Sequence, residues 1–332
     1  MSEHKVEFAN LVIKFGDEDM LDHPEIIFPV FMRDTLVRGY GGTTYHFMDQ
    51  QFLSYENDAS LYITGRFVKS QKLQREQYIE GGALKRDSAV LDTAPSAIFL
   101  LDLLTHRIAY AHETRFAPSL EQFRATVQRF AIIVHNQEAK RSKKERNESG
   151  HAITWEQMRL EYPAPSVNLT PLPNDLKVEQ AIEQFRLIKR LKLTLIDRNS
   201  EYTNAGEDAG NFRKRLTFLA PVRAVTEVVG GKDGLVKEEA KAFIHETAEA
   251  GYEQIVVKGV SEEGQSLTIT NEDMKLVERV ELSPVVKTSG KRLRELFIGL
   301  LTKGDIKVSL TNERRAQLEM RISELRQRYG IE

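Results

Sequence analysis

The residues with the clearest chemical potential in this 332-residue chain are lysines and arginines that gather in three short clusters. The formal net charge is only −2 at pH 7, so the total charge does not indicate an anionic partner. Clustered cations bind phosphate groups because they release the counterions that surround a nucleic acid. We therefore expect contacts with a nucleic-acid backbone from Lys140, Arg141, Lys143, Lys144, Arg213, Lys214, Lys291, Arg292 and Arg294.

The same clusters are also typical of solvated surface segments, because runs of charge commonly keep a loop exposed. The nucleic-acid interpretation requires that folding bring the clusters onto one surface, and separated patches would count against it. Phosphate contacts carry no base specificity, so these residues do not distinguish DNA from RNA.

A metal-dependent nuclease is the main enzymatic alternative. His106 and His112 would lie on the same face of a regular strand, and Asp102 could approach them after folding. Two-metal cleavage needs carboxylates around paired ions about 4 Å apart, and no spacing of acids predicts this arrangement. The sequence therefore identifies no catalytic residue, metal ligand or cofactor, and we expect a protein that binds without catalysis.

Composition narrows the class of protein further. The chain has no cysteine, which excludes disulfides, thiol nucleophiles and thiolate metal sites and fits a reducing, cytoplasmic compartment. No window approaches the roughly 18 apolar residues that a spanning helix needs, and the first residues show neither a basic leader nor an apolar run. With 41% hydrophobic residues the chain can bury a large core, and its length favours two domains.

The first domain is predicted over residues 1–137 and is rich in strands. Residues 6–15 are rich in β-branched and aromatic residues, residues 99–104 and 107–110 are predicted to form two joined strands, and Gly81 and Gly82 divide two extended stretches like a hairpin turn. Ser119 and Gln122 form a capping box that opens an amphipathic helix. Residues 138–174 are strongly polar and then contain several prolines, so we expect a basic, proline-containing connector there.

The second domain is predicted over residues 175–332 and mixes helices with strands. A helical stripe near residues 178–188 and a helix over 235–250 are each followed by a strand, and two more strands near 267–270 and 276–280 complete a meander. Ser289 is expected to cap a helix that ends at Gly304, followed by a short strand over 306–310. The whole chain is thus predicted to be α+β, with a β-rich first half and a mixed α/β second half that carries amphipathic helices.

The final helix offers a second functional hypothesis. Its apolar stripe could cover the chain's own core, or it could dock to a like chain or a partner protein. In the latter case the protein would be an assembly or adaptor subunit, and the contact residues would be Leu318, Ile322 and Leu325.

One segment resembles blocks found in other proteins. The stretch FLLDLLTHRIAYAHETRFAPSLEQF, residues 99–123, is similar to strand–strand–helix blocks in bacterial proteins from phage-defence islands. The resemblance covers under a tenth of the chain and carries over no catalytic residue. It implies a role as a subunit of a bacterial antiviral complex, which is an expectation from fold-level analogy.

Overall fold

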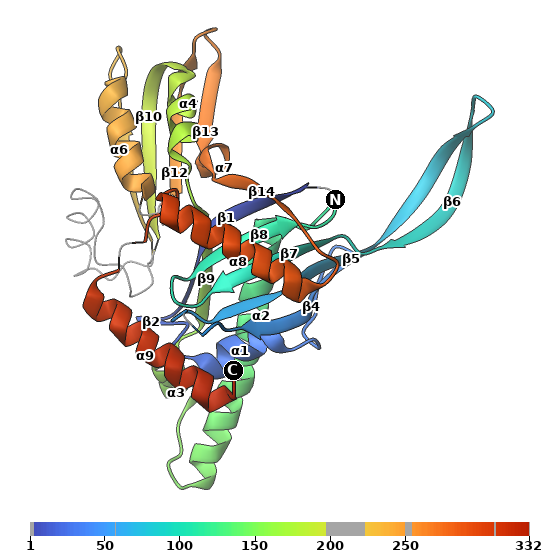
Figure 1. Cartoon of the computed structure of the whole chain (residues 1–332), viewed down its shortest axis with the longest axis vertical. Coiled ribbons are helices and arrows are strands. Elements are labelled where there is room, and N and C mark those ends of the chain that lie inside the picture. The colour runs from blue at the N-terminus through green and yellow to red at the C-terminus, as the bar shows by residue number, and fades with distance from the viewer. Residues whose placement is uncertain (1–2, 57, 197–222, 250–253, 309, 332) are drawn as a thin grey trace.

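The computed structural model describes residues 3–56, 58–196, 223–249, 254–308 and 310–331. It confirms an α+β protein whose β-rich first half forms a curled antiparallel sheet (Figure 1). The strands of this sheet from the first half are β1 (Glu3–Phe15), β2 (Glu18–Asp19), β3 (Arg38–Tyr40), β4 (Thr43–Leu53), β5 (Tyr62–Glu80), β6 (Ala83–Thr93), β7 (Ser96–Asp102) and β8 (Arg107–His112).

The sheet is completed by strands from later in the chain. Its main order is β14-β1-β8-β7-β5-β4-β3, where β14 is Val277–Glu281, and β9 (Pro165–Pro171) also pairs with β1. Strand β1 is buried over nearly its whole length because it pairs on both sides and has helices against both faces. Apolar residues on both of its faces suit a central strand with two covered faces, and the polar residues buried among them are Glu7, Asn10 and Lys14.

Two helical layers cover the two faces of this sheet. On one face lie α1 (Pro24–Met32) and α2 (Leu120–Glu148), whose aromatic side chains pack around Phe47 and Phe123. On the other face lies α8 (Val286–Lys303), which buries Leu293 and Phe297. The final helix, α9 (Asn312–Tyr329), joins the first of these cores.

Helix α8 approaches the sheet closely at a glycine. A Cβ atom at Gly290 would lie 2.8 Å from the Thr64 hydroxyl oxygen and 3.0 Å from a methyl carbon of Leu53. The helix ends, as the sequence predicts, at Gly304, which has a left-handed φ of 83°. It begins earlier than predicted, at Val286, so Ser289 lies within it and donates from its hydroxyl to the carbonyl of Ser283.

Residues from the middle of the chain form a separate four-stranded sheet in the order β11-β10-β12-β13. One of its faces is covered by two helices, which enclose a core around Phe185, Ile188 and Ile244. The elements of this part are α4 (Asp175–Glu183), β10 (Phe185–Ile196), β11 (Arg223–Val229), α6 (Lys237–Glu249), β12 (Gln254–Ser261), β13 (Ser266–Thr270) and α7 (Asn271–Met274).

The second half of the chain contributes to both sheets. After α7 the chain returns to the first sheet, because β14 pairs with β1 instead of continuing the meander of β12 and β13. Helices α8 and α9 then pack on the first sheet, so the predicted second domain, 175–332, contributes to two cores. The short strand predicted over 306–310 is absent from the described residues of that stretch.

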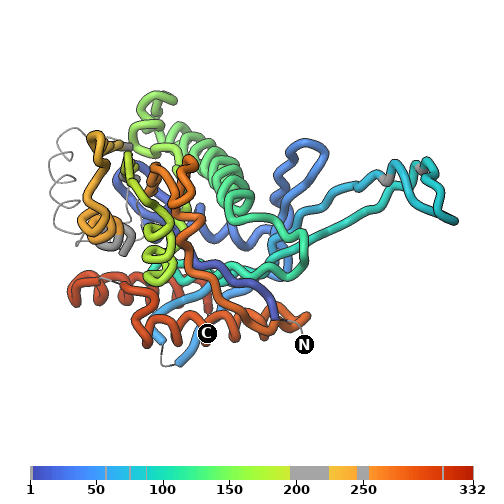
Figure 2. The backbone as a smooth tube through the Cα atoms, turned by 90° about the horizontal axis from the view of Figure 1, so that it is seen from above, coloured from blue at the N-terminus to red at the C-terminus, as the bar shows by residue number. Residues whose placement is uncertain are grey.

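Strands β5 and β6 continue beyond the sheet as a two-stranded arm that projects from the body (Figures 1 and 2). At its end Gly81 and Gly82 have φ angles of 60° and 79°, as a tight hairpin turn between twisted strands requires, which confirms the predicted turn. No helix in the described parts of the chain is long and apolar enough to cross a membrane.

Candidate nucleic-acid interface

The first basic cluster lies on a helix, not in a connector. Helix α2 extends from Leu120 to Glu148, and Ala139 is its last buried residue. The charged stretch beyond Ala139 remains helical because Lys, Arg, Glu and Gln are good helix formers and oppositely charged side chains pair along the helix. Arg141 contacts Glu138 at 2.5 Å and Glu145 at 3.7 Å. The capping box of Ser119 and Gln122 is present as predicted.

A short helix returns from the end of α2. Helix α3 (Trp155–Glu161) is capped by the Thr154 side chain, which accepts from the backbone N–H of Gln157. Met158 is the buried residue of α3. An ion pair between Arg146 on α2 and Glu161 on α3, at 2.6 Å, joins the two helices. In Figure 1 the far end of α2 extends below the body of the protein, and α3 lies near it.

Three lysines line one side of this end of α2, and one of them contacts the single tryptophan. Lys140, Lys143 and Lys144 follow helical spacing and, with Asn147 and Glu148, line a shallow pocket. The Nζ atom of Lys143 lies 4.6 Å from the centroid of the Trp155 ring, which is 47% exposed. We call Lys140, Lys143, Lys144, Asn147 and Trp155 the lysine–tryptophan tip.

The lysine–tryptophan tip offers the two contacts that single-stranded nucleic acid uses. Lysine ammonium groups neutralise phosphates, and an exposed aromatic face stacks on a base of any sequence. Trp155 was not singled out by the sequence reasoning, although a lone tryptophan shortly after a lysine-rich stretch is a signal that could have identified it.

The structure uses the other cations differently. Arg141 forms surface pairs with Glu138 and Glu145. Within the lysine–tryptophan tip, Lys144 also lies 3.8 Å from Glu148, in a weak surface pair that leaves it exposed. Arg213 and Lys214 lie outside the described residues. On α8, Lys291 is exposed, whereas Arg292 donates to the backbone carbonyl of Glu281 at 2.8 Å.

Arg294 contacts the interior of the protein. Its guanidinium lies 4.0 Å from the centroid of the Tyr55 ring and donates twice to one carboxylate oxygen of Asp58, at 2.5 and 2.9 Å. The side chains of Arg294 and Asp58 are only 21% and 14% exposed. These contacts fasten α8 to the loop before β5.

The basic cluster on α8 and the basic cluster at the end of α2 do not form one surface, because α8 lies on the body and the end of α2 projects away from it (Figure 1).

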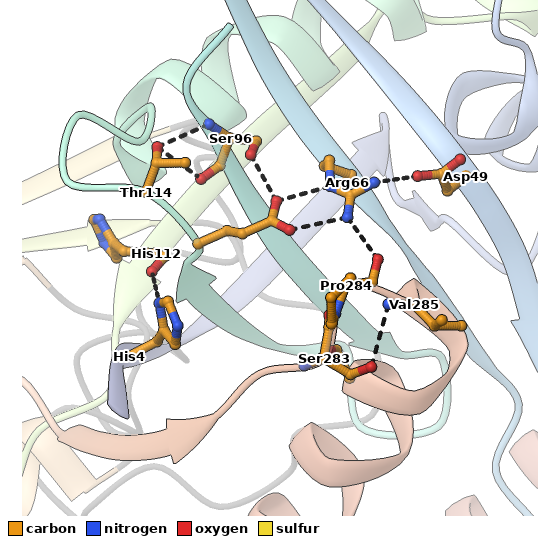
Figure 3. Close-up of polar contacts among 11 residues, drawn as sticks. His4, Asp49, Arg66, Ser96, His112, Thr114, Ser283, Pro284 and Val285 are labelled. Atoms are coloured by element: carbon orange, nitrogen blue, oxygen red, sulfur yellow. Dashed lines mark hydrogen bonds and ion pairs between the residues drawn. The ribbon is translucent and has the colours of Figure 1, made fainter. Parts of the chain in front are cut away.

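A cluster of polar contacts surrounds Arg66 within the sheet (Figure 3). Arg66 on β5 donates to both carboxylate oxygens of Glu113, at 2.7 and 2.9 Å, and to the carbonyl of Pro284 at 3.1 Å. It also contacts Asp49, which has a positive φ of 54° where β4 bulges opposite β5. Burial would raise the pKa of Glu113, but hydrogen bonds from Arg66 and Ser96 lower it. Arg66 thus joins four segments within the sheet, several residues before the arm begins at Gln71.

A second ionic group lies on β1. Glu7 is buried and contacts His112 at 3.4 Å, Lys275 at 3.2 Å and also Lys5. Burial would raise the pKa of Glu7, but hydrogen bonds from His112 and Lys5 and the charge of Lys275 lower it to about 2. His112, one histidine of the nuclease alternative, is thereby engaged in a structural ion-pair group.

The other residues of the nuclease alternative organise a turn. Asp102 is buried and accepts hydrogen bonds from Ser60, from the Thr105 hydroxyl at 2.6 Å and from the Leu104 backbone at 3.0 Å. Burial raises its pKa, although these donors oppose the shift. His106 is buried in the turn between β7 and β8 with a φ of 53°, so it does not continue the β8 strand. Among the described residues, no group of three or more His, Asp or Glu side chains is placed to hold a metal ion.

The residues predicted to bind a partner through the last helix are occupied within the chain. Leu318 and Ile322 are fully buried, and Leu325 is 6% exposed. They pack into the core on the α1 and α2 side of the sheet, because the narrow apolar stripe of α9 covers that core. The helix therefore presents its polar face outward, and a partner surface formed by these three residues would require the helix to leave the core.

Comparisons with known proteins give no functional assignment: no protein-family model matches the chain, and no curated protein matches its sequence.

Proposed function

We propose that this protein binds nucleic acid through the lysine–tryptophan tip, as a binding subunit without a catalytic centre of its own. The observation that supports this function is the half-exposed Trp155 ring next to Lys143, which lines a shallow pocket with Lys140 and Lys144 at the projecting end of α2. A surface that combines cations with an exposed ring suits a flexible strand, whose bases can turn to stack, better than a closed duplex. We therefore propose single-stranded DNA or RNA as the preferred ligand.

We propose fewer phosphate contacts than the sequence alone suggests. Lys140, Lys143 and Lys144 remain proposed phosphate contacts, and Trp155 is added as a stacking residue. Lys291 is exposed but lies on α8, away from the lysine–tryptophan tip (Figure 1). Arg292 and Arg294 are better explained by their bonds to Glu281 and Asp58.

The test is binding of labelled single- and double-stranded DNA and RNA by the purified chain across a salt series. We expect binding that weakens steeply between about 50 and 200 mM salt and that is tighter for single strands. The absence of binding to every probe at low salt would reject the proposal. Binding that is unaffected when the lysine–tryptophan tip is altered would reject this site.

We further propose that the protein acts in the cytoplasm as a subunit of a bacterial antiviral complex. The absence of cysteine supports a reducing compartment. The resemblance of residues 99–123 to blocks in phage-defence proteins supports the setting. Loss of protection against phage in cells that lack this chain, restored by the wild type, is the expected result, and unchanged protection would reject it.

A further inference from the structure

The projecting arm carries exposed apolar side chains on one face and charged side chains of both signs, including Lys72 and Lys85, on the other. Cross-strand partners share a face of a hairpin. The pairs Leu73–Leu91 and Ile79–Leu84 lie on one face, where all four side chains are 46–75% exposed. Between them the register has the pairs Arg75–Ala89 and Gln77–Arg86, separated by a bulge, so the apolar part of this face is at the end of the arm. The described acids of the arm, Glu76, Glu80 and Asp92, occupy the alternate positions and therefore face the other way.

This apolar face has no partner within the described chain, although a two-stranded ribbon alone is only marginally stable in water. An exposed apolar face of this kind is typical of a surface that contacts another molecule. Exposed apolar side chains at the end of the arm, Ile79 and Leu84, would be buried by that contact.

The chain also has a matching concave surface. An apolar groove of about 430 Å³ lies between α6 and strands β10 and β11, within the range of binding pockets. Among its described lining residues the charged one is Glu239, and Val228 and Val236 on its rim are 42% and 68% exposed. The lining residues are Leu191, Val228, Leu235, Val236, Glu239, Ala240, Ala242 and Phe243.

We propose that the arm of one copy of this chain docks in the α6 groove of a second copy. The apolar end of the arm fits an apolar groove, and Arg86 beside that end complements Glu239 in the groove. The arm cannot fill the groove of its own chain, because the two views place the arm and α6 on opposite sides of the molecule (Figures 1 and 2).

An arm and a groove are different surfaces, so this contact is head-to-tail. Repeated contacts close into a ring or continue as an open filament. The contact is independent of the lysine–tryptophan tip, and the following test uses no nucleic acid.

The experiment measures molecular mass against protein concentration, by sedimentation or light scattering, up to several hundred micromolar. The arm variant is Ile79→Asp with Leu84→Asp, and the groove variant is Val228→Asp with Val236→Asp. All four side chains are exposed, so both variants should fold, which thermal unfolding checks. Val90→Asp is the matched control, because Val90 is 55% exposed on the opposite face of the same arm, where it pairs with Gln74.

We expect the wild type and the Val90→Asp control to associate, and each double variant to be monomeric with an association constant at least tenfold lower. A mixture of the two variants is the decisive sample. In this mixture the groove variant supplies an intact arm and the arm variant supplies an intact groove. The two should therefore form a 1:1 dimer and nothing larger. Glu239→Arg should weaken association, and combining it with Arg86→Glu should restore association.

A wild type that stays monomeric throughout this range would overturn the proposal. A mixture that stays monomeric while the wild type associates would overturn the arm-in-groove contact in favour of arm-to-arm packing or another surface. Association that survives both double variants would overturn it as well.

Discussion

Replacing the three lysines of the lysine–tryptophan tip with alanine should flatten the salt dependence of nucleic-acid binding. Each phosphate neutralised contributes about 0.9 to the slope of log affinity against log salt for duplex DNA and about 0.7 for a single strand. If Lys140, Lys143 and Lys144 each contact one phosphate, the triple variant loses about 2 from the single-strand slope. Over a fourfold rise in salt, the variant should therefore lose roughly twentyfold less affinity than the wild type.

The assay is fluorescence anisotropy with a short labelled oligonucleotide, repeated at several salt concentrations between about 50 and 200 mM. A charge-matched control replaces Lys232, Lys258 and Lys303, which are exposed elsewhere on the molecule. Both triple variants change the net charge by the same amount, so a general electrostatic effect would alter both slopes equally. Equal changes, or no change in the tip variant, would refute the assignment of phosphate contacts to this site.

Trp155 separates stacking from charge within the same assay. Trp155→Ala should weaken single-strand binding by roughly fivefold to a hundredfold, as alanine substitution of a stacking residue does, while leaving the salt slope nearly unchanged. Trp155→Phe should retain part of the affinity because it keeps an aromatic face. A Trp155→Ala variant that binds as tightly as the wild type would show that the ring does not contact a base.

Three further predictions concern stability. Glu7→Gln should cost about 1–2 kcal/mol near neutral pH, after allowance for solvent around its partners, because the low pKa of Glu7 reflects stabilisation of its charged form. That stabilisation is present above the ordinary pKa of 4.5 and is lost as the pH falls toward 2, so urea unfolding should show the variant converging with the wild type in acid. Gly290→Ala should lower the unfolding free energy by about 1–3 kcal/mol through overpacking, whereas Gly299→Ala in the same helix, where a Cβ meets nothing within 4 Å, should raise it by up to about 1 kcal/mol. Equal effects of the two substitutions would contradict the close packing of α8. Arg294→Ala should cost about 2–4 kcal/mol by leaving a largely buried carboxylate unpaired, yet leave the salt slope of binding unchanged; a flattened slope in a folded variant would restore Arg294 as a phosphate contact.

Local signals in the sequence identify many of the elements. The Ser119–Gln122 capping box, the Gly81–Gly82 turn and the terminal Gly304 each specify a backbone conformation within a few residues, and the structure contains all three. The α+β class follows from the same signals. The end of α2 was missed because a highly charged segment was interpreted as a connector, whereas ion pairs such as Arg141–Glu138 stabilise it as a helix.

The partners of the charged residues could not be predicted, because sequence position does not show which charges meet. Arg294 and Asp58 are separated by 236 positions and form one of the least exposed ion pairs in the described chain. A cluster such as Lys291, Arg292 and Arg294 therefore looks uniform in sequence but divides in the structure into one exposed cation and two that bond within the protein. Only the side-chain contacts distinguish cations that stabilise the fold from cations that remain on the surface for a ligand.

The arm presents the same problem in another form. The Gly81–Gly82 turn at its end is evident from the sequence. The alternation of side chains along β5 predicts two faces of the strand but does not show whether a helical layer covers either of them. The half of β5 near Tyr62 is covered by α8 on one face and by the α2 layer on the other, whereas the half near Ile79 lies beyond both layers. Where the helices end, apolar residues that would otherwise belong to a core become a contact surface. The two projections of this molecule thus carry different chemistry. The end of α2 presents lysines and a tryptophan, where we propose that a nucleic acid binds, whereas the end of the arm presents apolar side chains, where we propose a protein contact. Substitutions in one should leave the task of the other intact when binding is measured with an oligonucleotide that contacts a single copy.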